Sequence, residues 1–342
     1  MLHLGCFINQ QQIIQQRRAS CLKNLKILFK LAHNLLSKTC ANIIEYIQKI
    51  IFSQDFLERN RNHKPDFSRN RKLPLATLIL YFCNLIKSSY QPELNKFWKI
   101  LSGSVVAQNV VSKAALCKAR KKLKYEAFVE LNTKAVQYFN EQANPLKWHG
   151  FFLKAVDGST VKLPNFPEIV KHFGTWNPRQ GDPLPMARIS QLFDPLNGIT
   201  YHAFIAPKST GERELAAKHF EHLNESDLVL LDRGYPAFWL FKLILFYKAN
   251  FCSRISCTKW KIIRRFMESG CLEQVIMLPV PATSIAACKN LQLDTHPIRL
   301  RLVRVELESG ESEVLITSLI DTKKYPHQHF ADLYHDRWPI EQ

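Results

Sequence analysis

Residues 151–164 read FFLKAVDGSTVKLP, in which an apolar run ends at Asp157, and they decide the fold of the second half of the chain. Such a run is typical of a short, buried β-strand. A second run, DLVLLDRGYP at residues 227–236, has Asp232 directly after its apolar residues. A carboxylate after a buried strand is costly to leave unpaired, so it usually faces a cleft or binds a cation. A tight turn after the strand is the alternative for each acid taken alone.

The segments around these two runs predict an α/β layer with an antiparallel edge. Residues 187–207 predict a β-hairpin, because Asn197 and Gly198 supply turn residues between two alternating runs. Helices are expected at 212–223 and 236–250, with a strand at 251–256. From 257 to 320 the pattern is again that of strands, and a helix is expected to begin near Gln328.

The N-terminal part of the chain predicts helices. Apolar residues recur at helical spacing from about residue 20 to 58, and a polar, basic stretch at 59–74 reads as an exposed loop before a helix at 75–87. Ser112 is a good N-cap for a basic helix that carries Arg120, Lys121, Lys122 and Lys124. With the amphipathic helix that follows at 125–141, this pair suits a DNA-binding helix-turn-helix. The alternative is a basic helix face that is simply solvated.

The net charge of +18 is concentrated in the first part of the chain. Residues 1–150 hold 24 Lys and Arg against 8 Asp and Glu, whereas residues 151–342 hold 23 against 21. Such asymmetry indicates a polyanion as partner, because Lys and Arg on phosphates release condensed counterions. An anionic membrane surface is the rival partner.

Three other classes of protein fit the sequence poorly. The longest apolar stretch, residues 73–86, is shorter than the roughly 20 residues that span a bilayer. The N-terminus lacks the order of a secretory signal, so the cytoplasm is the expected location. The nine cysteines include no Cys-x-x-Cys pair, which disfavours a zinc knuckle.

The closing stretch LYHDRWPIEQ, residues 333–342, adds a third acid, Glu341. Tyr334, Arg337 and Glu341 have a spacing that would share one helical face, although Pro339 favours the start of a new helix there. Three carboxylates that converge repel one another, and a divalent metal held by hard oxygen ligands stabilises such an arrangement. Two ions would activate an attacking oxygen and stabilise the leaving one at phosphorus.

The blocks AVDGST, LLDRGYP and YHDRWPIE resemble the three signature blocks of the DDE transposases of bacterial insertion sequences, in particular the IS-four family with its Tyr, Arg, Glu, Lys motif. The resemblance runs from about residue 60 to the end of the chain. It implies an α/β catalytic core with a ribonuclease-H-like mixed sheet, a β-rich insertion, and a helical N-terminal DNA-binding domain. The expected segments are 1–145, 146–256, 257–325 and 326–342.

The resemblance also implies the site and its partners. Asp157, Asp232 and Glu341 would bind two magnesium ions, or manganese in their place, while Tyr334 and Arg337 would hold the DNA end. The expected partners are double-stranded DNA, as terminal inverted repeats and as target, and a second copy of the chain when two ends are bound. No membrane partner is expected, and the protein would act on the nucleoid.

The resemblance leaves one departure and two rival functions. The Lys that the family pattern places seven positions after the Glu is absent, so we expect a truncated copy of uncertain activity. The favoured function is cut-and-paste DNA transposition by metal-dependent cleavage and strand transfer. The alternatives are a non-catalytic DNA-binding remnant and a metal-dependent nuclease. Magnesium-dependent cleavage would distinguish a transposase from the DNA-binding remnant. Preference for element ends over random DNA would distinguish a transposase from the nuclease.

Overall fold

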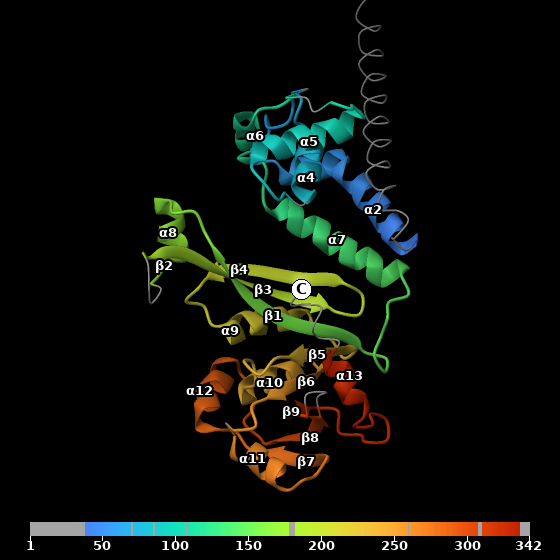
Figure 1. Ribbon diagram of the computed structural model, residues 1–342, viewed down its shortest axis with the longest axis vertical. Helices are drawn as coiled ribbons and strands as arrows, with labels where there is room; N and C mark the ends of the chain where they lie inside the picture. The colour runs from blue at the N-terminus through green and yellow to red at the C-terminus, as the bar shows by residue number, and fades with distance from the viewer. Residues whose placement is uncertain are drawn as a thin grey trace, which may run out of the picture. The chain divides into compact units, whose positions relative to one another are not determined.

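The computed structural model describes residues 38–69, 71–84, 86–106, 109–177, 182–258, 260–306 and 310–335 (Figure 1). The chain divides into two compact units, Met1–Asn144 and Pro145–Gln342, and each unit has hydrophobic cores of its own. The finer division into four segments stays a prediction.

Helices build the described part of the N-terminal unit. Helix α4 is apolar on every side, and Leu75, Leu78 and Ile79 are fully buried between two core clusters. The longest apolar stretch of the sequence is therefore the central helix of a small core, and no described helix is long and apolar enough to cross a membrane. The helices are α2 (Lys38–Ile51), α3 (Gln54–Asn60), α4 (Leu75–Cys83), α5 (Tyr90–Ser102), α6 (Lys113–Arg120) and α7 (Glu126–Gln142).

Ser112 caps α6 as predicted, because its hydroxyl accepts a hydrogen bond from the Ala115 amide. The helix ends at Arg120, four residues earlier than expected. The reason is tertiary: the following residues pair with the segment after α3, with Lys124 N donating to Asn60 O and an isolated bridge between Arg61 and Leu123. The predicted helix at 75–87 also ends early, at Cys83, and residues 20–37 lie outside the described residues.

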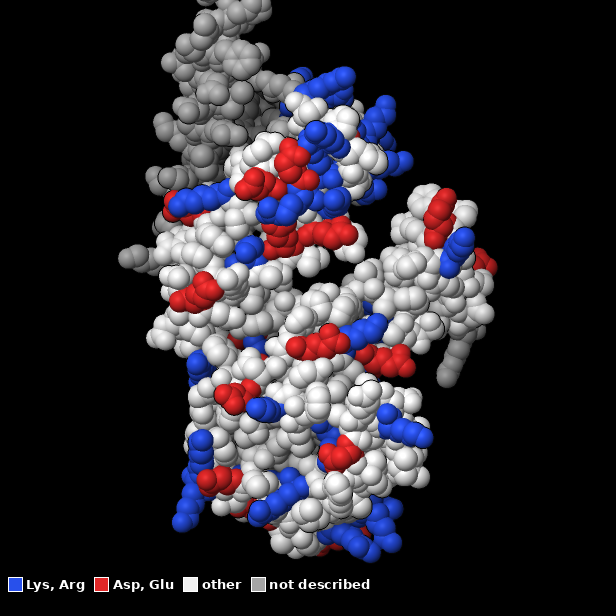
Figure 2. Space-filling model, turned by 180° about the vertical axis from the view of Figure 1, so that it is seen from behind, with Lys and Arg blue, Asp and Glu red and all other residues white. Residues whose placement is uncertain are grey.

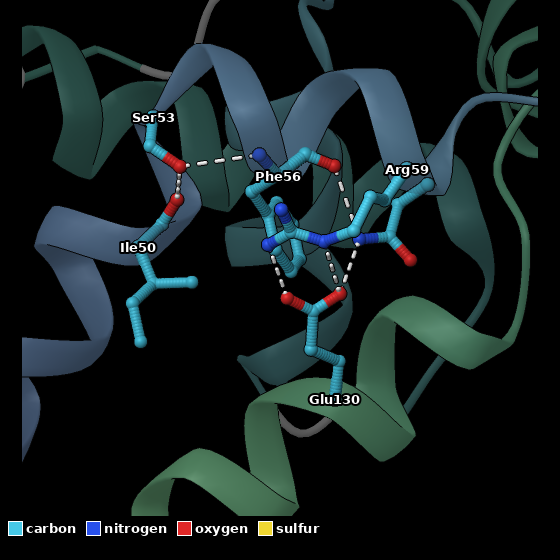
Figure 3. A network of polar contacts seen from close by, with 6 residues as sticks. Ile50, Ser53, Phe56, Arg59 and Glu130 are labelled. Carbon is cyan, nitrogen blue, oxygen red and sulfur yellow. Dashed lines mark hydrogen bonds and ion pairs between the residues drawn. The ribbon is translucent and has the colours of Figure 1, made fainter.

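A polar network joins α3 to α7 (Figure 3). Ser53 caps α3 by accepting a hydrogen bond from Phe56 N. At the other end of α3, the buried Asn60 side chain donates to Phe56 O and to Glu130 on α7, and Arg59 donates to the same carboxylate. The amide of Asn60 thus depends on Glu130 for one of its hydrogen bonds.

The second unit is built on one mixed sheet. Strands β3 and β4 form the predicted hairpin, β3 pairs antiparallel with β1, and β1, β5 and β6 run parallel. This arrangement is the ribonuclease-H-like sheet that the sequence predicts. The elements are β1 (Phe152–Lys162), α8 (Pro167–Phe173), β2 (Thr175–Trp176), β3 (Leu184–Asp194), β4 (Ile199–Pro207), α9 (Glu212–His219), β5 (Asp227–Leu231), α10 (Phe238–Phe246), β6 (Asn250–Ile255), α11 (Lys261–Glu268), β7 (Glu273–Leu278), α12 (Ala282–Asn290), β8 (Ile298–Glu306), β9 (Ser312–Thr317) and α13 (His329–His335).

The segment predicted as a β-rich insertion does not form a separate sheet. Strand β9 pairs antiparallel with β6, and β8 and β7 follow, so the order continues β6-β9-β8-β7. An unpaired β6 would leave a row of open backbone donors and acceptors, and β9 covers that edge. Two helices, α11 and α12, also belong to this segment. The segment therefore extends the sheet of β1, β5 and β6 directly.

Both faces of the sheet are covered, as the fully buried strand β5 requires. Val229 and Leu231 pack in the cluster that includes residues of α9, α10, α11 and α12. Leu228 and Leu230 point to the opposite face, in the cluster that includes Phe330, Leu333 and Tyr334 of α13. Alternation along the strands therefore decides which side chains face α13.

We predict that Glu130→Gln destabilises the N-terminal unit by about 1 kcal/mol, because the charged acceptor of the hydrogen bonds from Arg59 and Asn60 is replaced by a neutral amide oxygen. The hydrogen bond from Arg59 lowers the pKa of Glu130 below its ordinary value of 4.5, and burial opposes this shift. A lowered pKa stabilises the fold above the ordinary value, and this stabilisation is lost as the pH falls through the lowered value.

Urea unfolding of the full chain, followed by circular dichroism at pH 7 and at pH 4, measures both effects. The stability difference between wild type and variant should shrink at the lower pH. Glu141→Gln, an exposed change near the other end of α7, is the matched control and should change little. Equal stability of E130Q and wild type at pH 7 would contradict the role given to this network.

Candidate active site

The two predicted aspartates stand at matched positions of neighbouring strands. Strands β1 and β5 are parallel, and Ala155 is the partner of Leu230. Continuing the same register by two residues sets Asp157 beside Asp232. Strands lie about 4.8 Å apart, so the two residues are close neighbours across the sheet.

Asp157 is not at the end of its strand, where the sequence analysis expects it. Strand β1 continues to Lys162, because beyond Ala155 it keeps its antiparallel partner β3, with Asp157 opposite Gln191. Strand β5 stops at Leu231, so Asp157 lies where β1 loses its parallel neighbour. Beyond Leu231, β1 therefore has no strand paired with it on the β5 side.

Both carboxylates belong to the face of the sheet that α13 covers. Leu153 and Ala155 point into the α13 cluster, and alternation directs Asp157 the same way. Leu228 and Leu230 of β5 also point into the α13 cluster, and alternation directs Asp232, directly after this strand, to the same face. The hydroxyl of Tyr334 on α13 donates to Asp232 Oδ1 at 3.1 Å, which places this helix at the acid directly.

A cation from the next strand also meets Asp232. Arg254 on β6 donates to Asp232 Oδ1 from Nε at 3.0 Å, and its Nη2 lies 2.9 Å from the same oxygen. Its Nη1 donates to Glu313 Oε1 on β9 at 2.7 Å. Burial would lower the pKa of Arg254, but Tyr334 and the carboxylates of Asp232 and Glu313 outweigh it and raise the pKa.

The donor chemistry of the two aspartates fits a divalent metal ion. Carboxylate oxygens are the hard ligands that magnesium and manganese prefer, and here they come from adjacent strands on one face. Within the part of the chain that the structure describes, no three side chains of His, Cys, Asp or Glu are grouped to hold a metal ion. Glu341, the third acid of the predicted set, and Arg337 lie outside the described residues.

The sequence analysis did not identify two residues beside this site, Glu212 and Tyr235. A Cβ at Gly158 would lie 3.6 Å from the Tyr235 hydroxyl and 3.7 Å from Cγ of Glu212, which are ordinary contact distances, so both residues lie close to this glycine. Burial raises the pKa of Tyr235, and the negative charges of Asp157, Glu212 and Asp232 act in the same direction. Tyr235 is therefore a neutral hydroxyl, and it belongs to the cluster of Val229 and Leu231 on the face of the sheet opposite α13.

No sequence signal separates Glu212 from an ordinary helix cap, because acids in the first turn of a helix are common. Its carboxylate also forms an ion pair with Arg188 on β3, with Nη2 and Oε1 3.5 Å apart. Tyr235 could have been found as part of the run Asp-Arg-Gly-Tyr-Pro after β5. Two other acids of this unit have structural contacts: Asp194 accepts hydrogen bonds from the backbone of the hairpin turn, and Asp227 pairs with Lys154.

The four predicted DNA-binding residues near α6 differ in their surroundings. Arg120 and Lys121 are exposed, although Arg120 donates to the Tyr90 hydroxyl. Lys122 forms an ion pair with Asp66 at 3.1 Å, and Lys124 donates to the backbone oxygen of Arg59. The four residues thus lie at the end of α6 and in the turn after it. Lys122 and Lys124 already contact Asp66 and Arg59 of the α3 segment.

A basic groove of about 590 Å³ lies between α6 and the loop that precedes α4, and Lys122 also lines it. No ion pair engages Arg69, Arg71 or Lys118 within the described ranges, and all three are exposed. On the face in Figure 2, Lys and Arg gather over the N-terminal unit, whereas both signs of charge are interspersed over the sheet unit. The groove is lined by Pro65, Phe67, Arg69, Arg71, Lys72, Leu73, Val110, Val111, Ser112, Ala115, Lys118, Ala119 and Lys122.

Comparison with known proteins was made by sequence and by structure. The chain is similar to the transposase InsG of insertion sequence element IS4 from Escherichia coli K12, with 25% identity over 281 residues, 80% of this chain and 61% of that protein. It is also similar to the putative transposase InsZ of the same organism, with 27% identity over 109 residues, 31% of this chain and 36% of that protein. The chain therefore spans less than two thirds of the length of these relatives.

A solved structure with some likeness is a piggyBac transposase synaptic complex with hairpin DNA, at 12% identity and a TM-score of 0.44, covering 86% of this chain and 66% of that one. The family model described as the transposase DDE domain matches residues 153–342. This match begins in β1, includes Asp157 and Asp232, and covers more than half of the chain. The chain belongs to the DDE transposase family.

Proposed function

We propose that this chain carries the catalytic core of a DNA transposase that cleaves phosphodiester bonds at the ends of an insertion sequence and transfers the freed 3' ends to target DNA. The observation that carries the proposal is the parallel register of β1 and β5, which sets Asp157 beside Asp232 when it is continued by two residues, together with the hydrogen bond from Tyr334 to Asp232. Membership of the DDE family supports the reaction class. Asp157, Asp232 and Glu341 are the proposed catalytic acids.

Transposases of the DDE family use divalent metal ions. We propose two magnesium ions here, with manganese as a substitute, held by Asp157, Asp232 and Glu341. When bound, such ions supply charge stabilisation at the attacking and leaving oxygens of an in-line displacement. The chain's own part is to hold Asp232 in one orientation through Arg254 and Tyr334.

The proposed partner is double-stranded DNA, as the terminal inverted repeats and as the target, with a homodimer when two ends are bound. We assign Arg337 and Tyr334 to the DNA end. The Tyr334 hydroxyl already engages Asp232 and its side chain is 5% exposed, so orienting the acid is an additional role for this residue. The proposed place of action is the nucleoid in the cytoplasm.

The basic groove beside α6 is the proposed contact for the DNA backbone in the N-terminal unit. Its cations Arg69, Arg71 and Lys118 are exposed, and they gain binding free energy by releasing counterions from DNA. Arg120 and Lys121 extend the same basic surface, whereas Lys122 and Lys124 are already engaged by Asp66 and the Arg59 carbonyl. We therefore propose that the groove contributes more to DNA binding than the turn after α6.

The metal-dependent step is tested with the full chain by following magnesium-dependent cleavage of DNA that carries element ends. Asp157→Asn and Asp232→Asn should each lower cleavage by roughly a hundredfold or more, because each removes a charged ligand. Each should also weaken the binding of Mn²⁺, measured separately by electron paramagnetic resonance. Asp294→Asn, at an exposed acid that pairs with Lys242, is the control and should change neither quantity.

Retention of Mn²⁺ binding in both variants would contradict the site. Cleavage of random DNA as fast as of element ends would instead favour the metal-dependent nuclease. DNA binding with no cleavage at any magnesium concentration would favour the non-catalytic DNA-binding protein.

DNA binding through the groove is tested by its dependence on salt. The triple variant R69Q/R71Q/K118Q of the full chain should lower DNA affinity and reduce the slope of log affinity against log salt by roughly 2 to 3, one for each lost phosphate contact. The control K87Q/K99Q/K134Q removes equal charge from the same unit at residues that do not line the groove. Equal losses in the two variants would show that net charge, and not the groove, sets the affinity.

A further inference from the structure

Among the side chains described above, Arg254 alone contacts two acids, Asp232 of the core and Glu313 of the sheet extension. It lies on β6, between Asp232 after β5 and Glu313 on β9. Cys252 and Leu315 point into the α13 cluster, and alternation sets Arg254 and Glu313 on that same face. The bridge therefore crosses the face on which the proposed catalytic acids stand.

The guanidinium is held on two edges. Nε and Nη2 meet Asp232 Oδ1 at 3.0 and 2.9 Å, and Nη1 meets Glu313 Oε1 at 2.7 Å. A planar guanidinium that is fixed on both edges cannot rotate without breaking a charged hydrogen bond. The side chains of Arg254 and Glu313 are only 16% and 19% exposed, so water weakens these bonds little.

The contacts leave Asp232 with a defined orientation. Arg254 Nε, Arg254 Nη2 and Tyr334 Oη all meet the same oxygen, Oδ1, which has only about two lone-pair directions. Because every nitrogen of Arg254 already meets a carboxylate oxygen, this residue is poorly suited to bind a DNA phosphate as well.

We propose that Arg254 is a positioning residue that orients Asp232 for metal binding and that Glu313 sets the strength of its hold. This proposal rests on the proposed function, since it concerns the same acid. Glu313 draws part of the guanidinium's charge toward β9. Without Glu313, Arg254 interacts with Asp232 alone and competes more strongly with a metal ion for that carboxylate.

A double-mutant cycle on Mn²⁺ affinity tests this coupling, using the full chain and electron paramagnetic resonance below the melting temperature of every variant. Glu313→Gln alone should weaken Mn²⁺ binding about fivefold or more, because its effect passes through Arg254. In the R254Q background the same E313Q change should alter Mn²⁺ affinity less than about twofold. Asp294→Asn removes an acid from the same unit without touching this bridge and should leave Mn²⁺ affinity unchanged.

Arg254→Lys is the second variant, and it replaces R254Q in the double-mutant cycle if R254Q does not fold. Lysine keeps the charge but has no planar fork, so it cannot hold both carboxylates and should likewise reduce the effect of E313Q. An equal effect of E313Q in all three backgrounds would overturn the proposal, because Glu313 would then act by its own charge. If D232N leaves Mn²⁺ binding intact, the proposed metal site itself is wrong, which is a distinct result.

Discussion

The pairing of β1 with β5 is the constraint on which the rest of the site depends. Its register sets two carboxylates beside each other on one face of a sheet. Carboxylates that stand close together repel one another. Two surrounding elements offset this repulsion by donating hydrogen bonds to Asp232: β6 through the Arg254 guanidinium and α13 through the Tyr334 hydroxyl.

The continuous sheet explains why the segment after β6 matters to the site. Strand β9 covers the open edge of β6 and brings Glu313 to Arg254. The same strand contributes Val314 and Ile316 to one core and Leu315 to the other, so its position is fixed by packing on both faces. A change in that packing would move Glu313, and Arg254, which contacts both acids, would then change the orientation of Asp232.

Sequence patterns predict the parts of this structure that depend on local order. The apolar run before Asp232, the hairpin at 187–207 and the cap at Ser112 are all present, since each is decided by neighbouring residues. Contacts between distant segments were not predictable. Asp157 lies inside a long strand because β3 stays paired with it, and Arg254 is a single charge in an otherwise ordinary strand run. Its partner Glu313 is 59 residues away in sequence.

The two units use their cations differently, and this follows from their charge balance. In the nearly neutral second unit, many cations meet acids: Arg254 with Asp232, Arg188 with Glu212, Lys154 with Asp227. Cations held this way release few counterions on binding DNA, because their charge is already compensated. In the basic N-terminal unit, acids are too few to pair every cation. The proposed affinity for DNA therefore rests chiefly on the helical unit, whereas in the sheet unit the pair of Arg254 and Asp232 serves the proposed site.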